Sequence, residues 1–393
     1  MHDRTIQVLN IIAQETGDTP EELRNNPETE FADLGIDKLL SEAIIRQLHK
    51  TMWLNMPSDL FENCPTVGSL ACFLEESEPK PILNTVPVYT RAASPSTERQ
   101  AALNQAVVDQ PLSIRLQGNP KGQAKTIFLL PDGSGSAMSY ARIPFLGPGV
   151  CLYGLNSPFL SKPERFPPIP EIAPIWAAEI RRLQPKGPYI LGGWSAGGYY
   201  CFEVAKHMML NETEADGRPV VVEKLVLIDS PCRTVFEALP MIVVTTLSNQ
   251  GLMGNWGHRG APQWLLDHFA ATIARVEEYN PSPLASASAD EVLPKVFIIW
   301  ATNGVYAAGG SAASGLDTKV KVTKFMLEDR LDFGPNGWDV LFPRGTEVAI
   351  ATSPGTHFTL VSPPNSVHIA SRLSDILHDK TAHDNRLWKH WSC

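Results

Sequence analysis

Apolar residues in the first 78 positions recur at the spacing of amphipathic helices. Two sets each share one helical face: Ile6, Leu9 and Ile12, and then Leu40, Ile44 and Leu48. Prolines at 57 and 65 punctuate two shorter helical segments, the second over residues 67–74. The pattern predicts a small four-helix domain over residues 1–78.

Residues 79–110 differ from both flanking regions. They contain repeated Pro, Ser and Thr and few large apolar side chains, so they cannot build a core of their own. This composition is typical of a linker between domains.

Short apolar runs and helical segments alternate over residues 111–385. The runs cover residues 113–116, 126–130, 150–155, 189–191, 224–228, 295–300 and 347–351. Helical periodicity lies between several of them, notably over residues 172–183 and 199–209. Strands separated by helices predict a mostly parallel sheet with both faces covered.

One interval, from about residue 235 to 284, contains helical stretches but no clear strand. An insertion of this length between strands is typical of a lid over a site. Its large apolar side chains exceed what a solvated insertion needs. We expect several of them to face a substrate chamber over Ser195; the alternative is that they only pack the lid onto the sheet. They include Leu252, Met253, Trp256, Trp264 and Phe269.

Composition and charge narrow the class of protein. Apolar residues make up 43% of the chain, which rules out wholesale disorder. The formal charge of −9 argues against a nucleic-acid or anionic-membrane binder, and the apolar runs are shorter than the roughly 20 residues of a membrane span. The six scattered cysteines form no CxxC pair, and the N-terminus lacks a secretory signal, so we expect a cytoplasmic protein with free thiols.

The strongest motif is Gly193-Trp194-Ser195-Ala196-Gly197, a G-x-S-x-G sequence. A predicted strand precedes it and a predicted helix follows it. In this context the glycines permit a sharp turn that exposes the serine hydroxyl at the start of the helix. Ser195 is therefore the candidate nucleophile.

A serine nucleophile needs a base, and the base needs an acid to orient it. Asp229 directly follows the strand after Ser195, at the strand end where open parallel sheets place functional groups. His357 lies on a loop after the last predicted strand and completes the order Ser, acid, His. His368 is the alternative base, but it falls in the helical stretch that follows. We expect a triad of Ser195, His357 and Asp229.

An oxyanion hole would need backbone N–H groups near Ser195. We expect one from Ala196 and another from the loop over residues 131–136, at Asp132 or Gly133. This Gly/Ser-rich loop lacks the Lys-Ser/Thr of a P-loop and the GxGxxG spacing, which excludes a phosphate cradle. We expect no metal in the site.

Five motifs in order resemble the C-terminal thioesterase of fungal non-reducing polyketide synthases. They are Leu130-Pro-Asp-Gly-Ser-Gly-Ser-Ala137, Gly192-Gly-Trp-Ser-Ala-Gly-Gly198, Leu227-Ile-Asp-Ser-Pro-Cys232, Asp332-Phe-Gly-Pro-Asn-Gly-Trp-Asp339 and Gly355-Thr-His-Phe-Thr359. The resemblance implies an α/β-hydrolase fold with a helical lid. It also implies a serine that accepts a polyketide acyl group from a carrier protein, and release by hydrolysis, Claisen cyclisation or attack of another nucleophile.

Residues 1–78 resemble an acyl carrier protein through Phe31-Ala-Asp-Leu-Gly-Ile-Asp37 and the following Leu39. Lys38 stands where that family has the serine that accepts phosphopantetheine. Because an amine cannot form the phosphodiester, we expect a pseudo-carrier and no phosphopantetheine on this chain. Ser41 lies outside the motif and is a poor substitute for the serine.

The combination resembles standalone pseudo-carrier–thioesterase proteins of fungal clusters. The resemblance implies release, in trans, of 2,4-dihydroxy-6-alkylbenzoic acids of the olivetolic acid type. The implied partner is the carrier protein of a non-reducing synthase, with a highly reducing synthase upstream. Two alternatives stay open: an excised Claisen-cyclase thioesterase, and a non-catalytic docking protein.

Overall fold

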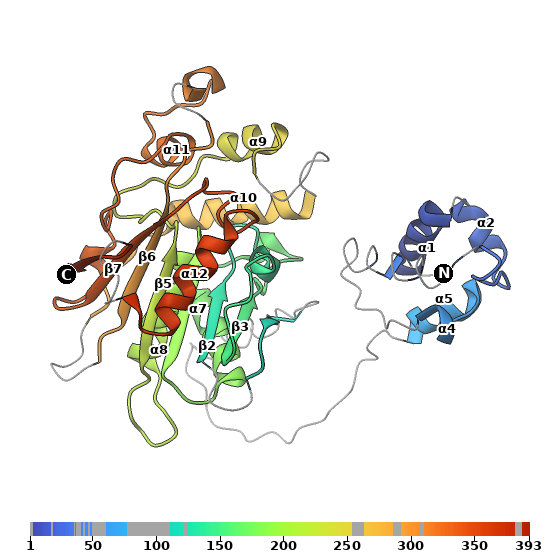
Figure 1. The fold of residues 1–393 in the computed structure, drawn as a ribbon, viewed down its shortest axis with the longest axis horizontal. Coiled ribbons are helices and arrows are strands. Elements are labelled where there is room, and N and C mark those ends of the chain that lie inside the picture. The colour runs from blue at the N-terminus through green and yellow to red at the C-terminus, as the bar shows by residue number, and fades with distance from the viewer. Residues whose placement is uncertain are drawn as a thin grey trace. The chain divides into compact units, whose positions relative to one another are not determined.

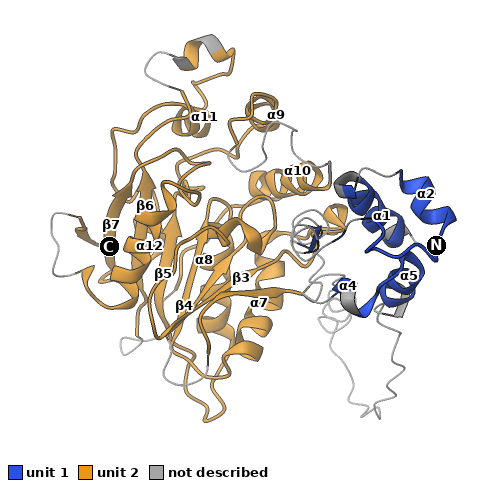
Figure 2. Ribbon diagram, turned by 45° about the vertical axis from the view of Figure 1, so that its right-hand side comes forward, with its two compact units in different colours: residues 1–92 blue, residues 93–393 orange. Residues whose placement is uncertain are grey.

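The computed structural model forms two compact units, Met1–Ala92 and Ala93–Cys393 (Figure 2). The described residues are 3–16, 19–34, 36, 41, 44–45, 48, 60–76, 111–120, 125–253, 263–285, 292–306, 310–381 and 387–393. Lys38, Trp256 and the predicted linker 79–110 lie outside them.

The first unit is helical wherever it is described as regular structure. Its elements are α1 (Asp3–Thr16), α2 (Pro20–Asn25), α4 (Leu60–Asn63) and α5 (Val67–Glu76), with helical backbone also at Ser41, Ile44, Ile45 and Leu48. A capping box fixes the start of α2, because Thr19 accepts from the Glu22 N–H and the Glu22 carboxylate accepts from the Thr19 N–H. The predicted apolar positions form the core, which includes Leu9, Ile12, Ile44, Leu48 and Leu70.

The second unit is built on an eight-stranded sheet of order β1-β3-β2-β4-β5-β6-β7-β8 (Figure 1). The strands are β1 (Ser113–Gln117), β2 (Lys125–Leu130), β3 (Val150–Leu155), β4 (Tyr189–Trp194), β5 (Val222–Ile228), β6 (Lys295–Ala301), β7 (Glu347–Ser353) and β8 (Lys389–Ser392). β2 to β7 are parallel, whereas β1 and β8 pair antiparallel at the two edges. All seven predicted strands are present.

Helices cover both faces of this sheet. On β2, Phe128 and Leu130 belong to the cluster that contains α7 (Ile169–Leu183) and α8 (Gly197–Asn211). Ile127 and Leu129 point to the opposite cluster, which α12 (Ser366–Leu377) closes. Because side chains alternate along a strand, a strand buried on both faces is apolar at successive positions.

Two insertions extend the unit beyond the carboxyl ends of the strands. The predicted lid interval holds α9 (Met241–Asn249) and α10 (Gln263–Glu278), between β5 and β6. A second insertion, between β6 and β7, holds α11 (Lys321–Leu327), which the sequence pattern did not reveal. Short 3₁₀ helices lie at Ala137–Tyr140, Pro163–Arg165, Gly310–Ser314 and Asp339–Leu341.

The predicted end of the second domain at residue 385 is too early. β8 pairs with β7 from Glu347↔Ser392 to Ile350↔Lys389, and the fully buried Trp388 packs against Phe297 beneath the sheet. A strand of four exposed residues carries no periodic signal, which is why the pattern missed it. Among the described residues, the helices are all too short or too polar to span a bilayer.

Candidate active site

Ser195 sits on a tight turn between β4 and α8. Its φ of 58° lies in the left-handed region, which costs energy for a non-glycine residue and is typical of functional turns. The flanking glycines make this turn possible. A Cβ on Gly193 would lie 2.2 Å from the Gly197 backbone, and one on Gly197 would lie 2.6 Å from the Leu130 carbonyl oxygen.

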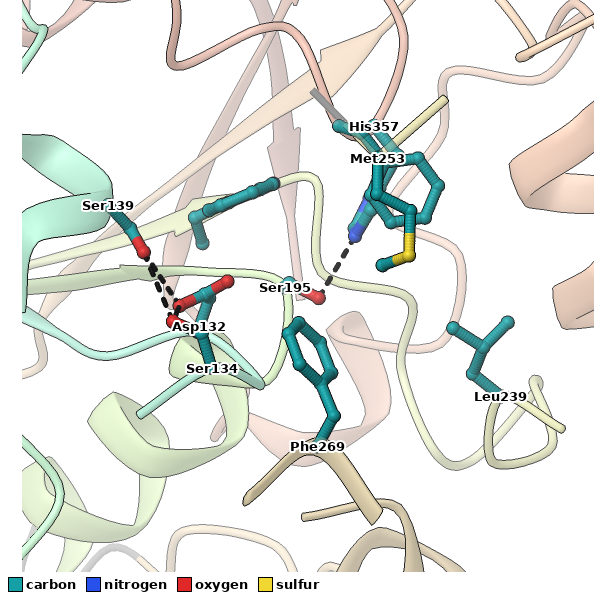
Figure 3. A pocket seen from close by; sticks show the side chains of 10 residues that line it. Asp132, Ser134, Ser139, Ser195, Leu239, Met253, Phe269 and His357 are labelled. Atoms are coloured by element: carbon teal, nitrogen blue, oxygen red, sulfur yellow. Dashed lines mark hydrogen bonds between the residues drawn. The ribbon is translucent and has the colours of Figure 1, made fainter. Parts of the chain in front are cut away.

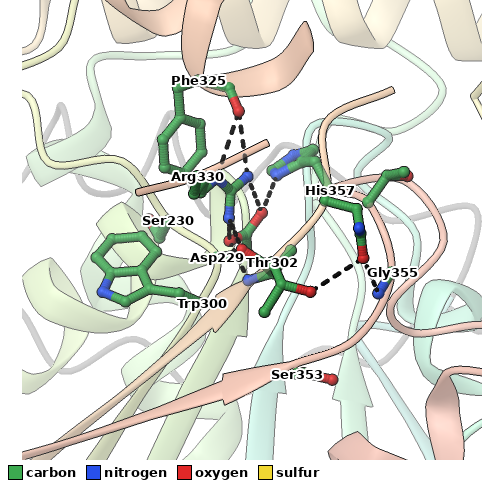
Figure 4. A network of polar contacts seen from close by, with 12 residues as sticks. Asp229, Ser230, Trp300, Thr302, Phe325, Arg330, Ser353, Gly355 and His357 are labelled. Carbon is green, nitrogen blue, oxygen red and sulfur yellow. Dashed lines mark hydrogen bonds and ion pairs between the residues drawn. The ribbon is translucent and has the colours of Figure 1, made fainter. Parts of the chain in front are cut away.

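The structure brings Ser195, His357 and Asp229 together from three separate strand ends (Figures 3 and 4). Ser195 Oγ lies 2.9 Å from His357 Nε2, and His357 Nδ1 lies 2.8 Å from Asp229 Oδ2. Because a carboxylate only accepts, His357 donates from Nδ1, which leaves Nε2 to accept the serine proton. His357 and Asp229 are buried. The alternative base, His368, lies on α12.

Asp229 has two further partners that the sequence did not reveal. Its Oδ1 accepts from the Ala301 N–H at 2.8 Å, and Arg330 donates to both carboxylate oxygens. Burial alone would raise the pKa of Asp229, but the Arg330 charge and the His357 hydrogen bond outweigh it and hold that pKa well below its usual range. The Asp229 carboxyl group is therefore ionised at neutral pH. The nearest motif in the sequence begins at Asp332, two residues after Arg330, and does not include the arginine.

The loop after β2 carries the predicted oxyanion residues Asp132 and Gly133. The Tyr140 hydroxyl ties this loop to the nucleophile, because it donates to the Leu130 carbonyl at 2.5 Å and accepts from the Trp194 N–H at 2.9 Å. Ala196, the third predicted residue, precedes α8 as its N-cap. The Tyr140 hydroxyl thus links the loop that carries Asp132 and Gly133 to the end of β4, just before Ser195 and Ala196.

Asp132 also brings a carboxyl group to the site. Its Oδ1 accepts from Ser134 Oγ at 2.5 Å and from Ser139 Oγ at 2.8 Å. In Figure 3 these three residues lie on one side of Ser195. Burial raises the pKa of Asp132, although the serine hydrogen bonds oppose the shift.

Helix α10 packs directly on the loop after β2, over residues 131–136. The Gly133 carbonyl accepts from His268 Nδ1 at 3.0 Å and from Thr272 Oγ1 at 3.2 Å. A Cβ on Gly133 would lie 2.6 Å from the Phe269 ring, and one on Gly135 would lie 2.4 Å from the His268 ring. Burial lowers the pKa of His268 to about 4, so its ring is neutral at neutral pH. The lid helix therefore fixes this loop through a neutral histidine.

Two compartments meet at Ser195. One combines the polar side chains of Asp132, Ser134, Ser139 and His357 with the apolar side chains of Trp194, Leu239, Met253, Phe269 and Phe358. The other is almost wholly apolar and lies against α10 and α11, where Ile273, Val276, Val322 and Met326 line it.

The predicted lid residues are therefore divided. Met253 and Phe269 line the compartments, and Leu252 is half-buried against the core of the unit. Trp264 is 42% exposed and is not among the described lining residues of either compartment. Within the part of the chain that the structure describes, no three His, Cys, Asp or Glu side chains are grouped to hold a metal ion.

Both units of the chain match known protein families. Residues 125–377 match the thioesterase domain model, and residues 7–74 match the phosphopantetheine attachment site model. The chain belongs to the thioesterase domain family, and the predicted fold class, a helical carrier-like domain followed by an α/β-hydrolase-type thioesterase, is confirmed.

The sequence relatives are fungal polyketide synthases. The chain is 37% identical, over 91% of its length, to a non-reducing polyketide synthase of Byssochlamys spectabilis. It is 35% identical, over 90% of its length, to a conidial pigment polyketide synthase of Aspergillus fumigatus. These matches cover 17% and 16% of the two relatives, so the chain spans about a sixth of their length. The resemblance to carrier and thioesterase domains of such synthases is confirmed.

Two solved structures are also similar to this chain. The NocB thioesterase domain, in covalent complex with a fluorophosphonate nocardicin G analogue, covers 67% of this chain and 98% of its own, with 21% identity and a TM-score of 0.44. A four-domain nonribosomal peptide synthetase, bound to AMP and glycine, covers 95% of this chain and 26% of its own, with 18% identity and a TM-score of 0.51. The second likeness concerns the fold alone.

The prediction that this chain carries no phosphopantetheine is wrong. The match of residues 7–74 to the phosphopantetheine attachment site family indicates that cofactor on this chain. The prediction rested on one position, Lys38, whereas the family match extends over the whole helical domain. Lys38 itself lies outside the described residues.

Proposed function

We propose that this protein is a serine thioesterase that releases an aromatic polyketide from the phosphopantetheine arm of a carrier protein by hydrolysis. The observation that carries the proposal is the hydrogen-bonded series from Ser195 Oγ through His357 to Asp229, in a member of the thioesterase family. The same series argues against a non-catalytic docking protein, because a dead hydrolase has no need to keep it.

The first half-reaction transfers the acyl group to the enzyme. Ser195 Oγ attacks the thioester carbonyl carbon while His357 Nε2 takes the hydroxyl proton, and Asp229 stabilises the resulting imidazolium. Backbone N–H groups of Ala196 and of Asp132 or Gly133 stabilise the oxyanion. When the intermediate collapses, the C–S bond breaks and His357 returns the proton to the departing thiol.

The second half-reaction frees the product. His357 takes a proton from water as the water oxygen attacks the acyl-serine carbonyl. The intermediate then collapses, the bond to Ser195 Oγ breaks, and His357 returns the proton to the serine. The products are a free carboxylic acid and the original enzyme.

The lining of the two compartments supports a hydroxylated aromatic acyl group with an alkyl tail. Asp132, Ser134 and Ser139 offer hydrogen-bonding groups to ring hydroxyls. The compartment beneath α10 and α11 offers apolar area to a tail, at roughly 0.8 kcal/mol for each buried methylene. A 2,4-dihydroxy-6-alkylbenzoyl group, the olivetolic acid type, has both features, and we propose it as the substrate class.

We further propose that the substrate arrives in trans, from the carrier of a non-reducing synthase that a highly reducing synthase primes. Support comes from the second unit, where nucleophile, base and acid all lie between residues 195 and 357. The reaction therefore needs only a carrier, on this chain or another, that presents its thioester to Ser195.

The test uses a separately expressed synthase carrier domain loaded with 2,4-dihydroxy-6-pentylbenzoyl phosphopantetheine. The full chain is added in water enriched in ¹⁸O, and the product is identified by mass spectrometry. We expect the free acid with one ¹⁸O in its carboxyl group, and none above background with Ser195→Ala.

A second carrier, loaded with an acyl group that keeps a β-keto methylene, tests the Claisen alternative. If the enolate of that methylene attacks the acyl-serine carbonyl and displaces Ser195 Oγ, the carbon–carbon cyclised product would replace hydrolysis. No release from the separate carrier, with normal cleavage of a small soluble thioester of the same acid, would overturn the action in trans.

A further inference from the structure

Arg330 is a buried cation that directly contacts the acid of the triad. Its side chain is 5% exposed and follows α11 in the insertion between β6 and β7. Nη1 donates to Asp229 Oδ1, and Nη2 donates to Asp229 Oδ2 at 2.8 Å. A guanidinium with two parallel bonds to a carboxylate fixes both its position and its plane.

The surroundings hold the guanidinium in place (Figure 4). The Ala301 carbonyl accepts from Nη1 at 2.8 Å, and the Phe325 carbonyl accepts from Nη2 at 3.3 Å. The Phe325 ring lies 3.6 Å from the guanidinium carbon, as a cation–π partner. Backbone and ring thus restrain Arg330 independently of Asp229, so it orients Asp229 rather than following it.

Arg330 also acts on His357 through charge. Both side chains contact the same Asp229 carboxylate, so a positive charge on the His357 ring forms close to the guanidinium. The charged groups that face this pair among the described residues are Arg330 and, from the loop after β2, Asp132. The guanidinium therefore keeps the Asp229 carboxylate ionised and in place while His357 takes up the serine proton.

From this geometry we infer that Arg330 is a positioning residue of the triad, which clamps the Asp229 carboxylate in the plane and orientation that His357 Nδ1 needs. The inference rests on the proposed roles of Ser195 and His357 as nucleophile and base. Neither of the two proposed half-reactions assigns a role to Arg330. Arg330 itself touches neither Ser195 nor the acyl group.

The experiment measures the rate at which a fluorophosphonate probe labels Ser195, as a function of pH. Labelling requires the triad but no particular acyl group, so it reads Arg330 even if the proposed substrate is wrong. The variants are Arg330→Met, which removes the charge, and Arg330→Lys, which keeps the charge but not the two-point bond. Arg372→Met is the matched control, because Arg372 is a buried arginine on α12 whose Nε donates to the Thr352 carbonyl at 3.4 Å.

For Arg330→Met we expect the plateau labelling rate to fall by about 100-fold, as for a misplaced catalytic group. Arg330→Lys should also lower the plateau, because an ammonium cannot make the two parallel bonds to the carboxylate. Free guanidinium should restore part of the labelling of Arg330→Ala. Arg372→Met should label at the wild-type rate.

Two results would overturn the inference. One is an Arg330→Ala variant whose labelling is not restored by free guanidinium, since rescue in this way is not expected of a merely structural role. The other is an Arg330→Lys variant with the wild-type plateau. Should Arg330→Met fail to fold, Arg330→Lys decides the matter, together with recovery of Arg330→Ala labelling by free guanidinium at non-denaturing concentration.

Discussion

His268→Gln tests whether the histidine that joins α10 to the Gly133 carbonyl is held neutral by burial. Burial lowers the pKa of His268 from 6.5 to about 4 in the folded protein, and the Gly133 hydrogen bond only partly opposes this. The unfolded chain therefore takes up a proton between pH 6.5 and 4 that the folded chain refuses. Stability is full above pH 6.5 and falls as the pH drops. A difference of about 2.5 units, at about 1.36 kcal/mol each, amounts to about 3 kcal/mol.

Glutamine retains an N–H donor for the Gly133 carbonyl but does not titrate. We therefore expect the wild type to lose about 3 kcal/mol more unfolding free energy than His268→Gln between pH 7 and pH 4. Urea unfolding followed by tryptophan fluorescence reports mainly the second unit, which contains eight of the nine tryptophans. Contributions from the other titrating groups cancel in the difference.

Thr272→Val is the matched control for this experiment. It removes the second donor to the Gly133 carbonyl without removing a titrating group, so its stability curve should run parallel to that of the wild type. If the His268→Gln curve also runs parallel to the wild type, His268 is not held neutral, and the reasoning from burial fails.

Two further predictions concern packing around the triad and the buried Lys224. Gly193→Ala should lower the fluorophosphonate labelling rate by about 100-fold, because its Cβ would lie 2.2 Å from the Gly197 backbone and displace Ser195. The control Gly334→Ala should label normally, because its Cβ meets only a side-chain oxygen at 3.2 Å; equal rates for the two variants would show that the close approach at Gly193 does not matter. Lys224→Met should lower the unfolding free energy by about 1–3 kcal/mol, because the buried ammonium lies 2.6 Å from Asp379; an unchanged urea midpoint would contradict this.

The apolar pattern predicted the parallel strands well because each of them is buried on both faces. β3, for example, has six consecutive buried residues, so its sequence is an uninterrupted apolar run. β8 is exposed along its whole length and gave no such signal. The pattern therefore located the centre of the sheet and missed one of its antiparallel edges.

The candidate triad was predictable because its three residues follow strand ends in a fixed order. Ser195 and Asp229 directly follow β4 and β5, and His357 follows β7 by a short loop. Arg330 and His268 were not predictable in the same way. Each lies in an insertion, and its contact with the site depends on how that insertion folds back over the strand ends.

Peptide mapping of the acyl-enzyme shows whether Ser195 carries the acyl group. The full chain is mixed with a 2,4-dihydroxy-6-pentylbenzoyl thioester, quenched in acid within the first turnover, digested and analysed by mass spectrometry. We expect the acyl mass on Ser195 and its absence in Ser195→Ala and His357→Ala. An acyl group on another residue, or continued hydrolysis by Ser195→Ala, would show that Ser195 is not the nucleophile.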